Sequence, residues 1–308
     1  MWGINSHNRE YAAYPEKYYK EHVRLSAELG CKLYRFNYNP VNEEQLAYLD
    51  SVMAELKTYG MDMMLVIDDD SGTLEEIAAR MKIVAGRYGK DSSHGFIKYI
   101  QTFNETNMFA MKETSGNQHF PHGTVPEEFS KAAIDNWYGR LDAAITAIRE
   151  VNRDVEIVLN IAYKGYGYLK ALEQRGLKWE AVGIDWYEHC GDFSGILDPV
   201  KEQFPGHEII ICETNIFSKE STVNAPLSRW QWLLDNMEPL YKDDRVKGVI
   251  FYELLDQPAL VTGGNVFGDA ETSEEANAGI IACSANGEIG KPKAVYGEIQ
   301  RLIGGSNT

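Results

Sequence analysis

Along the whole chain, short apolar runs alternate with longer segments in which apolar residues recur every three or four positions. The short runs are typical of buried strands, and the longer spacing is typical of amphipathic helices. This pattern predicts eight strands, at residues 2–8 (with the loop that follows), 32–37, 61–67, 99–105, 156–162, 181–187, 208–213 and 246–252. It predicts helices at 15–29, 42–59, 73–88, 127–151, 166–175, 195–203, 226–241 and 292–303, with a turn at 280–288 before the last of them.

The alternation of strands and helices determines the fold class. A strand that returns through a helix runs parallel to its predecessor, by a right-handed crossover. Eight such units in 308 residues, without a linker or a shift in composition, favour a closed barrel over an open doubly wound sheet. No Gly-x-Gly-x-x-Gly follows a strand, so the open sheet lacks its dinucleotide-binding feature. We therefore predict an α/β fold, a (β/α)8 TIM barrel that forms a single domain over residues 1–308.

Composition narrows the possible partners. The formal net charge is −16, and no run of Lys and Arg is present. Nucleic acids and anionic membrane surfaces both require clustered positive charge, so we expect neither as a partner. A neutral substrate suits such a chain better, and we predict that the protein is a monomer.

Cysteine usage and the start of the chain bear on metals and compartment. Cys31, Cys190, Cys212 and Cys283 are widely spaced, without a CxxC pair, which predicts no metal site. We expect Cys31 and Cys212 to be buried thiols. No signal peptide is visible, and the first strand begins almost at Met1. The compartment stays open, and a secreted or periplasmic location is favoured only if a signal peptide has been removed.

Two predicted strands end at a glutamate, Glu105 on the fourth and Glu213 on the seventh. A sheet core has no use for a charge, so each glutamate is expected where its strand emerges from the sheet. The strands of a parallel barrel all emerge on one face, where the active site lies, and this would bring the two carboxylates together. Paired carboxylates are the minimum requirement for glycoside hydrolysis. The alternative is two unrelated strand-end glutamates, each solvated or ion-paired.

Further polar residues end the other strands and would form a ring at the same face. Amides, carboxylates, phenols and one arginine in such a ring suit a ligand that is rich in hydroxyl groups. The ring comprises Asn5, His7, Arg35, Asn37, Asp68, Asn104, Glu105, Asn160, Tyr163, Asp185, Tyr187, Glu213, Tyr252 and Glu253. In a strand, side chains alternate between the two faces, so every second residue shares a face. Strict alternation places on one face Leu33, Arg35 and Asn37 of the second strand and Gln101, Phe103 and Glu105 of the fourth. In the same way it groups Gly183, Asp185 and Tyr187 of the sixth strand and Ile209, Ile211 and Glu213 of the seventh.

At these strand ends the sequence resembles the clan A glycoside hydrolases, which are (β/α)8 retaining enzymes. Asn104-Glu105 closing the fourth strand and Glu213 closing the seventh match the clan signature. Arg35 and Tyr187, which close the second and sixth strands, match its supporting pair. The run GKPKAVY at 290–296 resembles the start of the last helix in several members.

Three positions depart from the clan pattern. Thr106 follows Glu105 where proline is commoner, Asn215 stands where the Glu-Thr-Gly triplet has glycine, and Tyr252 ends the eighth strand where many families have tryptophan. These departures leave the family open, with family 39 and its small single-domain relatives the most similar.

The resemblance implies cleavage of β-glycosidic bonds by double displacement. Glu213 would be the nucleophile, and Glu105 would be the general acid and then the general base. Arg35 would keep Glu213 ionised and Tyr187 would hold its attacking oxygen, while Asn104 would bond the sugar 2-hydroxyl. Further substrate contacts are predicted for His7, Asn37, Asn160, Trp186, His189, Tyr252 and Glu253. No metal or other cofactor is expected.

Plainer interpretations stay open for several of these residues. Arg35 can be a strand-end ion-pair partner, and Tyr187 a core residue with a solvated hydroxyl. The acidic run at 68–70 suggests a metal site, but consecutive acidic side chains point in different directions, which favours a solvated turn. For the whole chain the alternatives are a non-catalytic carbohydrate-binding barrel and a metal-dependent barrel hydrolase. The metal-dependent enzyme is disfavoured because the first strand lacks His-x-His.

Two long irregular segments, 106–127 and 256–279, follow the fourth and eighth strands. Insertions of that length are usually functional. The first contains His119 and His122, but a zinc site would need further ligands nearby. A compact barrel without accessory domains favours endo action on an oligo- or polysaccharide. The identity of the sugar depends on loop geometry that the pattern does not give.

Overall fold

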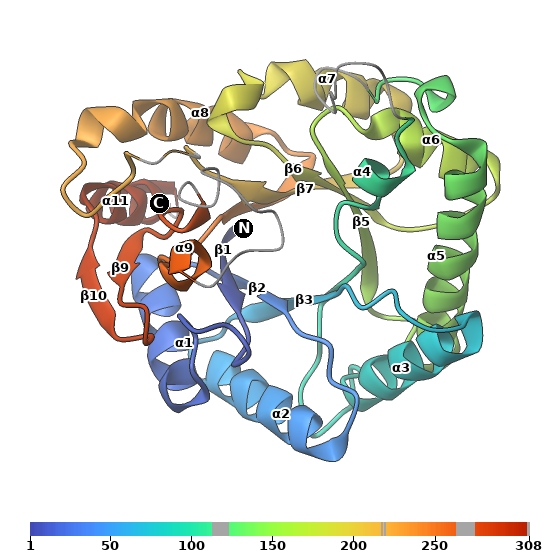
Figure 1. Ribbon diagram of the computed structural model, residues 1–308, viewed down its shortest axis with the longest axis horizontal. Coiled ribbons are helices and arrows are strands. Elements are labelled where there is room, and N and C mark those ends of the chain that lie inside the picture. Colours follow the sequence, from blue (N-terminus) through green and yellow to red (C-terminus); the bar gives the residue numbers. More distant parts are fainter. Residues whose placement is uncertain (113–122, 217, 219, 263–274, 307–308) are drawn as a thin grey trace.

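Eight parallel strands close into a barrel in the computed structural model, and helices surround it (Figure 1). The structure describes residues 1–112, 123–216, 218, 220–262 and 275–306. The barrel strands are β1 Trp2–His7, β2 Leu33–Asn37, β3 Asp62–Ile67, β4 Tyr99–Thr102, β5 Glu156–Ala162, β6 Ala181–Asp185, β7 Glu208–Thr214 and β8 Val246–Phe251. Each strand pairs with its neighbours in chain order, and β8 closes onto β1. The predicted (β/α)8 barrel is confirmed.

Helices connect the strands on the outside of the barrel (Figure 1). The α-helices are α1 Tyr19–Leu29, α2 Glu43–Thr58, α3 Leu74–Arg87, α4 Thr106–Ala110, α5 Lys131–Val151, α6 Tyr166–Gln174, α7 Ser194–Gln203, α8 Gln231–Lys242, α9 Ala259–Thr262 and α11 Ala294–Ser306. Within the described residues, none of these helices is long and apolar enough to cross a membrane.

The segment predicted as a turn at 280–288 is instead part of a small antiparallel sheet. Its strands are β9 Ile281–Cys283 and β10 Ile289–Pro292. Ser284 accepts a hydrogen bond from the N–H of Gly287, whose φ of 77° lies in the left-handed region. Glycine adopts this region readily, so the chain reverses there and pairs with itself.

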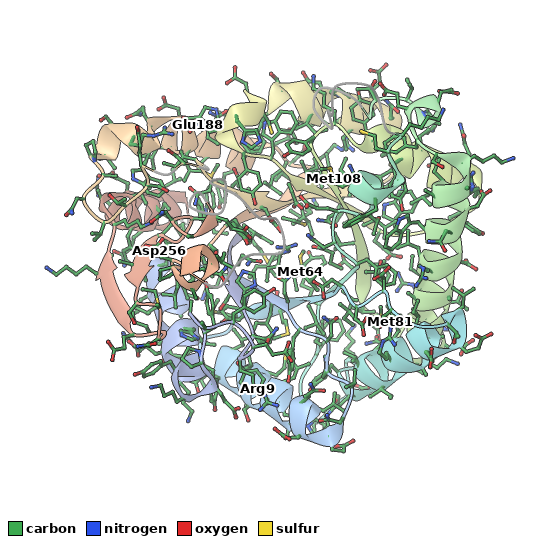
Figure 2. The ribbon with its side chains drawn as sticks, viewed as in Figure 1. Arg9, Met64, Met81, Met108, Glu188 and Asp256 are labelled. Carbon is green, nitrogen blue, oxygen red and sulfur yellow. The ribbon has the colours of Figure 1, made fainter. Side chains whose placement is uncertain are left out.

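Apolar side chains fill both the barrel and the layer between the barrel and the helices. A large cluster lies between strands and helices. A smaller one fills the interior, where Figure 2 shows Met64 near the centre; it comprises Leu33, Met64, Tyr99, Val158, Ala181, Ile210, Cys212 and Ile250. The interior is therefore a packed core, and the polar side chains of the site lie beyond it toward the carboxyl ends of the strands.

Gly183 on β6 makes room for larger neighbours inside the barrel. A Cβ at this position would lie 2.7 Å from the Cβ of Asn160 and 2.8 Å from the Sγ of Cys212. Such distances are well inside van der Waals contact, so a larger residue would displace one of the two side chains. Glycine at 183 thus allows Asn160 to point toward the site.

The predicted alternation on the seventh strand is wrong. Ile210 and Cys212 fill the barrel interior, whereas strict alternation had placed Ile209 and Ile211 there with Glu213. The pairing with β6 shifts register by one residue just before Glu213. A β-bulge of this kind inserts one extra residue and redirects the side chains that follow it. The bulge is what brings Glu213 to the same face as the interior residues.

The predicted alternation on the fourth strand also fails, at Phe103. Gln101 faces the barrel interior, but the ring of Phe103 packs on the outside against Trp137 of α5, with 5.7 Å between ring centroids. The strand has already ended at Thr102, and φ is 61° at Phe103 and 47° at Glu105. Such positive φ values are uncommon for residues other than glycine. This irregular backbone returns Glu105 to the site.

Candidate active site

Glu213 at the end of β7 is held by two donors from other strands. Arg35 donates from Nη1 to Oε1 at 2.7 Å, and Tyr187 donates from its hydroxyl to Oε2 at 2.5 Å. Both predicted contacts are confirmed. Burial and the negative charge of Glu213 raise the pKa of Tyr187 well above its usual range, so its hydroxyl keeps its proton and stays a donor.

Arg35 is fully buried and connects Glu213 to three amides. Besides Glu213, its guanidinium donates to Oδ1 of Asn5 at 2.7 Å and to Oε1 of Gln101 at 3.1 Å. It also donates to Oδ1 of Asn104 at 2.9 Å. A planar guanidinium with so many partners has a fixed orientation, and it fixes the Glu213 carboxylate in turn.

The Asn104 side chain has a defined orientation. Its Oδ1 accepts hydrogen bonds from Arg35, from Nε2 of Gln101 at 2.9 Å and from Nδ2 of Asn160 at 3.0 Å. Three donors around one atom identify that atom as the amide oxygen. The amide nitrogen has no partner among the described residues, so it is available to donate to a ligand.

Glu105 lies close enough to Glu213 for the charge of Glu213 to affect its pKa, and a neighbouring amide helps to position it. Its backbone N–H donates to Oδ1 of Asn160 at 2.9 Å. Burial, and secondly the negative charge of Glu213, raise the pKa of Glu105 to about 7. At neutral pH a large share of Glu105 is therefore protonated, unlike an ordinary glutamate.

Asn160 was predicted to bind substrate, but its hydrogen-bonding groups are already engaged. Besides accepting from Glu105, it donates from Nδ2 to Asn104 and to Oδ2 of Asp185, the latter at 2.6 Å. The side chain is also almost fully buried. We therefore assign Asn160 to the positioning of Glu105 and Asn104 and not to sugar binding.

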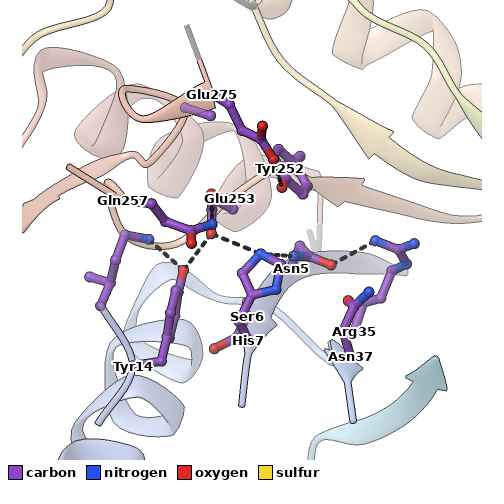
Figure 3. Close-up of polar contacts among 12 residues, drawn as sticks. Asn5, Ser6, His7, Tyr14, Arg35, Asn37, Tyr252, Glu253, Gln257 and Glu275 are labelled. Carbon is purple, nitrogen blue, oxygen red and sulfur yellow. Dashed lines mark hydrogen bonds and ion pairs between the residues drawn. The ribbon is translucent and has the colours of Figure 1, made fainter. Parts of the chain in front are cut away.

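Glu253 was also predicted to bind substrate, and the structure places it behind the site. Its side chain has no exposed surface. Tyr14 donates to Oε2 at 2.8 Å and Gln257 donates to Oε1 at 2.7 Å, as Figure 3 shows. The ring of His7 approaches Oε2 with Nε2 at 3.2 Å. A carboxylate enclosed in this way cannot reach a ligand directly.

His7 links Glu253 to the rest of the network (Figure 3). Its Nε2 is 3.3 Å from Nδ2 of Asn5, whose oxygen is bonded to Arg35. Its ring stacks on Tyr11, with 4.2 Å between centroids. A continuous chain of polar contacts therefore runs from Glu213 through Arg35, Asn5 and His7 to Glu253. The Nδ1 of His7 is buried and has no partner among the described residues.

Trp186 does not belong to the site, in contrast to the prediction. The ring has no exposed surface, and its indole N–H donates to the carbonyl of Gly191 at 2.9 Å. Trp186 directly follows the inward-facing Asp185, so alternation turns it toward the helix layer. His189, by contrast, is exposed, and its ring is parallel to that of Tyr187 with 6.1 Å between centroids.

The remaining predicted contacts lie at the ends of β2 and β8. Oδ1 of Asn37 is buried and has no partner among the described residues. The hydroxyl of Tyr252 donates to Oε1 of Glu275 at 3.3 Å. Glu275 follows the loop after β8, and burial followed by the charges of Glu253 and Glu213 raises its pKa. Both positions keep polar groups that a ligand could bind.

The sequence reasoning missed several residues of the network. The pattern marks Asn5 and Asp185 as polar strand ends without indicating their roles, and Gln101 shares the inward face with Arg35. Tyr14, Gln257 and Glu275 come from loops, where no periodic signal marks them. Their positions depend on the closed barrel, which brings the loops after β1 and β8 together.

Parts of both long loops lie outside the described residues. Positions 113–122 and 263–274 belong to the segments 106–127 and 256–279, and His119 and His122 fall among them. In the part of the chain that the structure describes, no group of three or more His, Cys, Asp and Glu side chains is arranged to hold a metal ion.

Comparison with known proteins finds similarity to solved structures of β-glycosidases. No protein-family model matches the chain, and no curated protein matches its sequence. The family 1 β-glucosidase from Thermotoga maritima superposes with a TM-score of 0.68 at 13% identity, covering 99% of this chain and 97% of that one. The same enzyme in complex with galacto-hydroximolactam gives 0.70 at 13% identity, covering 99% and 98%. A crystallised β-glycosidase gives 0.66 at 14% identity, covering 98% and 95%.

At such low identity the likeness shows the fold alone. The predicted resemblance to family 39 stays a prediction, since the neighbours described above include family 1 enzymes. The chain therefore shares the barrel of these β-glycosidases across nearly its whole length.

Proposed function

We propose that this chain is a retaining glycoside hydrolase that cleaves β-glycosidic bonds by double displacement. The observation that carries the proposal is a pair of neighbouring carboxyl groups with different surroundings. The two oxygens of Glu213 accept hydrogen bonds from Arg35 and Tyr187, which hold the carboxylate that a nucleophile needs. Burial raises the pKa of Glu105 to about 7, so a large share of it is protonated at neutral pH and can act as the acid. A nucleophile and a general acid require this difference.

In the first step, a carboxylate oxygen of Glu213 attacks the anomeric carbon. Glu105 gives its proton to the glycosidic oxygen, so the bond between that oxygen and the anomeric carbon breaks and a neutral alcohol leaves. Arg35 and Tyr187 hold the Glu213 carboxylate in place while it loses its charge to the new ester bond. The free N–H of Asn104 would donate to the sugar 2-hydroxyl, a contact that strengthens in the transition state.

In the second step, Glu105 is ionised and acts as a base. It takes a proton from water, the resulting hydroxide attacks the anomeric carbon, and the ester bond to Glu213 breaks. Two displacements retain the β configuration. Retention also predicts that the carboxyl groups of Glu105 and Glu213 lie about 5–5.5 Å apart.

The substrate class follows from the groups around the two carboxyls. Asn37, Tyr252 and His7 offer hydrogen-bonding groups, Glu275 adds a carboxyl group, and Arg35 is the one guanidinium in the described network. A neutral sugar fits these groups better than a uronic acid. The β-glucosidase names of the structural neighbours support a β linkage. We propose endo action on an oligo- or polysaccharide by a monomer, with no metal or cofactor.

A screen of aryl β-glycosides and β-linked polysaccharides tests the proposal. The wild type should release the β anomer first, as NMR of the fresh product shows, and Glu213→Ala should be inactive. Activity should survive exhaustive chelation. Initial release of the α anomer would contradict the retaining mechanism. If the protein bound these carbohydrates without cleaving them, the carbohydrate-binding barrel would be favoured. If chelation abolished activity and one divalent ion restored it, the metal-dependent hydrolase would be favoured.

A further inference from the structure

Asp185 is a third carboxyl group beside the two proposed catalytic ones, and the mechanism above does not use it. It ends β6, and strand pairing places it next to Glu213 on β7 and Ala162 on β5. Its side chain is only 1% exposed. An ionised Asp185 would be a further negative charge in a buried place already occupied by Glu105 and Glu213, which is unfavourable.

The two oxygens of Asp185 have different surroundings. Oδ2 accepts from Nδ2 of Asn160 at 2.6 Å. Oδ1 is buried and receives no hydrogen bond from any donor in the described residues. The carboxyl of Glu105 lies near enough for each of the two groups to alter the pKa of the other. Two ionised carboxylates at such a buried place would repel each other, which favours a proton on one of them.

The difference in burial favours Asp185 as the group that keeps the proton, since its side chain is buried whereas Glu105 is partly exposed. Burial, and then the charges of Glu213 and Glu105, raise the pKa of Asp185 well above its usual range, although Arg35 acts in the opposite direction. The contact with Asp185 and the charge of Arg35 both lower the pKa of Glu105, which stays at about 7. The charged and titratable groups that face the pair are Glu213, Arg35, Glu275, Tyr187, Cys190 and Cys212.

We propose that Asp185 is a neutral carboxylic acid whose Oδ1–H donates a hydrogen bond to the carboxyl of Glu105, and that it positions and tunes this acid/base without touching the substrate. Asn160 supports both partners, since it donates to Oδ2 of Asp185 and accepts from the backbone of Glu105. The inference rests on the proposed function, in which Glu105 must exchange a proton in both steps.

The role of Asp185 follows from the two steps. When Glu105 gives its proton to the leaving oxygen, it becomes a carboxylate beside the ester of Glu213. The O–H of Asp185 then donates to that carboxylate, and a hydrogen bond to an ionised acceptor is about twice as strong as a neutral one. When Glu105 takes a proton from water, the bond weakens again. The proton of Asp185 never leaves it.

Two substitutions separate this proposal from its alternative. Asp185→Asn is neutral, keeps an oxygen toward Asn160 and keeps an N–H toward Glu105. The alkaline limb of its pH profile of kcat/KM should therefore lie within about 0.3 pH units of the wild type. Asp185→Ala removes the donor, so the limb should move up by about 1 pH unit and hydrolysis of the glycosyl-enzyme should slow about tenfold. Asp142→Asn, at an exposed position on α5, is the matched control and should change neither.

An ionised Asp185 gives the opposite result. Asparagine would then remove a negative charge, and the limb would move to lower pH by about 1 unit, which would overturn the proposal. Infrared difference spectra between wild type and Asp185→Asn at pH 7 give a second measurement without turnover. Loss of the C=O stretch of a protonated acid supports the proposal, and loss of carboxylate bands overturns it. If the wild type cleaves no glycoside, the proposed function fails, and the spectra still decide the protonation of Asp185.

Discussion

Arg35 and Glu213 form an ion pair of 2.7 Å whose side chains are only 0% and 9% exposed. Neither charge is well solvated by water at this place, so each depends on the other. Because the same guanidinium also bonds three amides, the orientation of the Glu213 carboxylate is fixed before any ligand arrives.

Replacing Arg35 by alanine should affect both stability and activity. Removing one partner of a buried pair leaves an uncompensated charge, so the free energy of unfolding should fall by about 3–5 kcal/mol in urea titration. Activity should fall by at least about 10³-fold. Arg9→Ala is the matched control, since Arg9 pairs with the exposed Glu16 and Glu44 and its loss should cost under about 1 kcal/mol. Equal effects of the two changes would contradict this assignment.

Removing the Tyr187 hydroxyl should slow catalysis with little effect on binding. A hydrogen bond to a charged group is worth about 1.5–3 kcal/mol, so Tyr187→Phe should lower kcat by about 10- to 100-fold and leave KM within about threefold. Tyr138→Phe on α5, away from the site, serves as the control. A kcat for Tyr187→Phe within twofold of the wild type would remove the proposed role.

The raised pKa of Glu105 has a consequence for stability. A carboxyl whose pKa is higher in the folded than in the unfolded state contributes stability that is present at low pH and is lost as pH rises through the folded value, here about 7. Glu105→Gln abolishes this loss. Between pH 4 and pH 9 the free energy of unfolding of this variant should therefore rise relative to that of the wild type by about 3 kcal/mol, measured by urea unfolding.

Glu202→Gln, at an exposed position on α7, is the control for that measurement. The difference in free energy of unfolding between this variant and the wild type should not change with pH. If the difference in free energy of unfolding between Glu105→Gln and the wild type were also independent of pH, the carboxyl of Glu105 would titrate at its ordinary pKa.

Azide rescue distinguishes the two glutamates. Glu105→Ala lacks the acid, so natural substrate should lose at least about 10²–10⁴-fold while an activated aryl glycoside still forms the glycosyl-enzyme. Azide then attacks that intermediate and should give the β-glycosyl azide. Glu213→Ala lacks the nucleophile, so both substrates fail together and azide should give the α product. Exchanged anomers would show that acid and nucleophile are assigned the wrong way round.

The apolar pattern was sufficient for the barrel but not for every side chain in it. Strand and helix periods depend on local backbone geometry, so alternating βα units could be recognised one segment at a time. The carboxylates at the ends of β4 and β7 stood out because charge is unfavourable in a sheet core. Arg35 and Tyr187 followed from the resemblance of their strand ends to the clan.

The errors arose where position depends on contacts between distant segments. Glu253 follows a strand end like the other candidates, but Tyr14 and Gln257 from two loops enclose it. Trp186 lies one residue beyond an inward position, so the same strand end sends it into the core. Neither outcome is visible in a local pattern, because the closure of β8 onto β1 and the packing of the helix layer decide it.

The register shift in β7 limits how this site can be moved to another protein. Glu213 reaches its partners because one extra residue precedes it, after Ile210 and Cys212 have filled the interior. A designer who copied Glu105, Glu213 and Arg35 onto an idealised barrel with regular strands would send the nucleophile toward the helices. The bulge would have to be transplanted with them, although none of its other atoms belongs to the reaction.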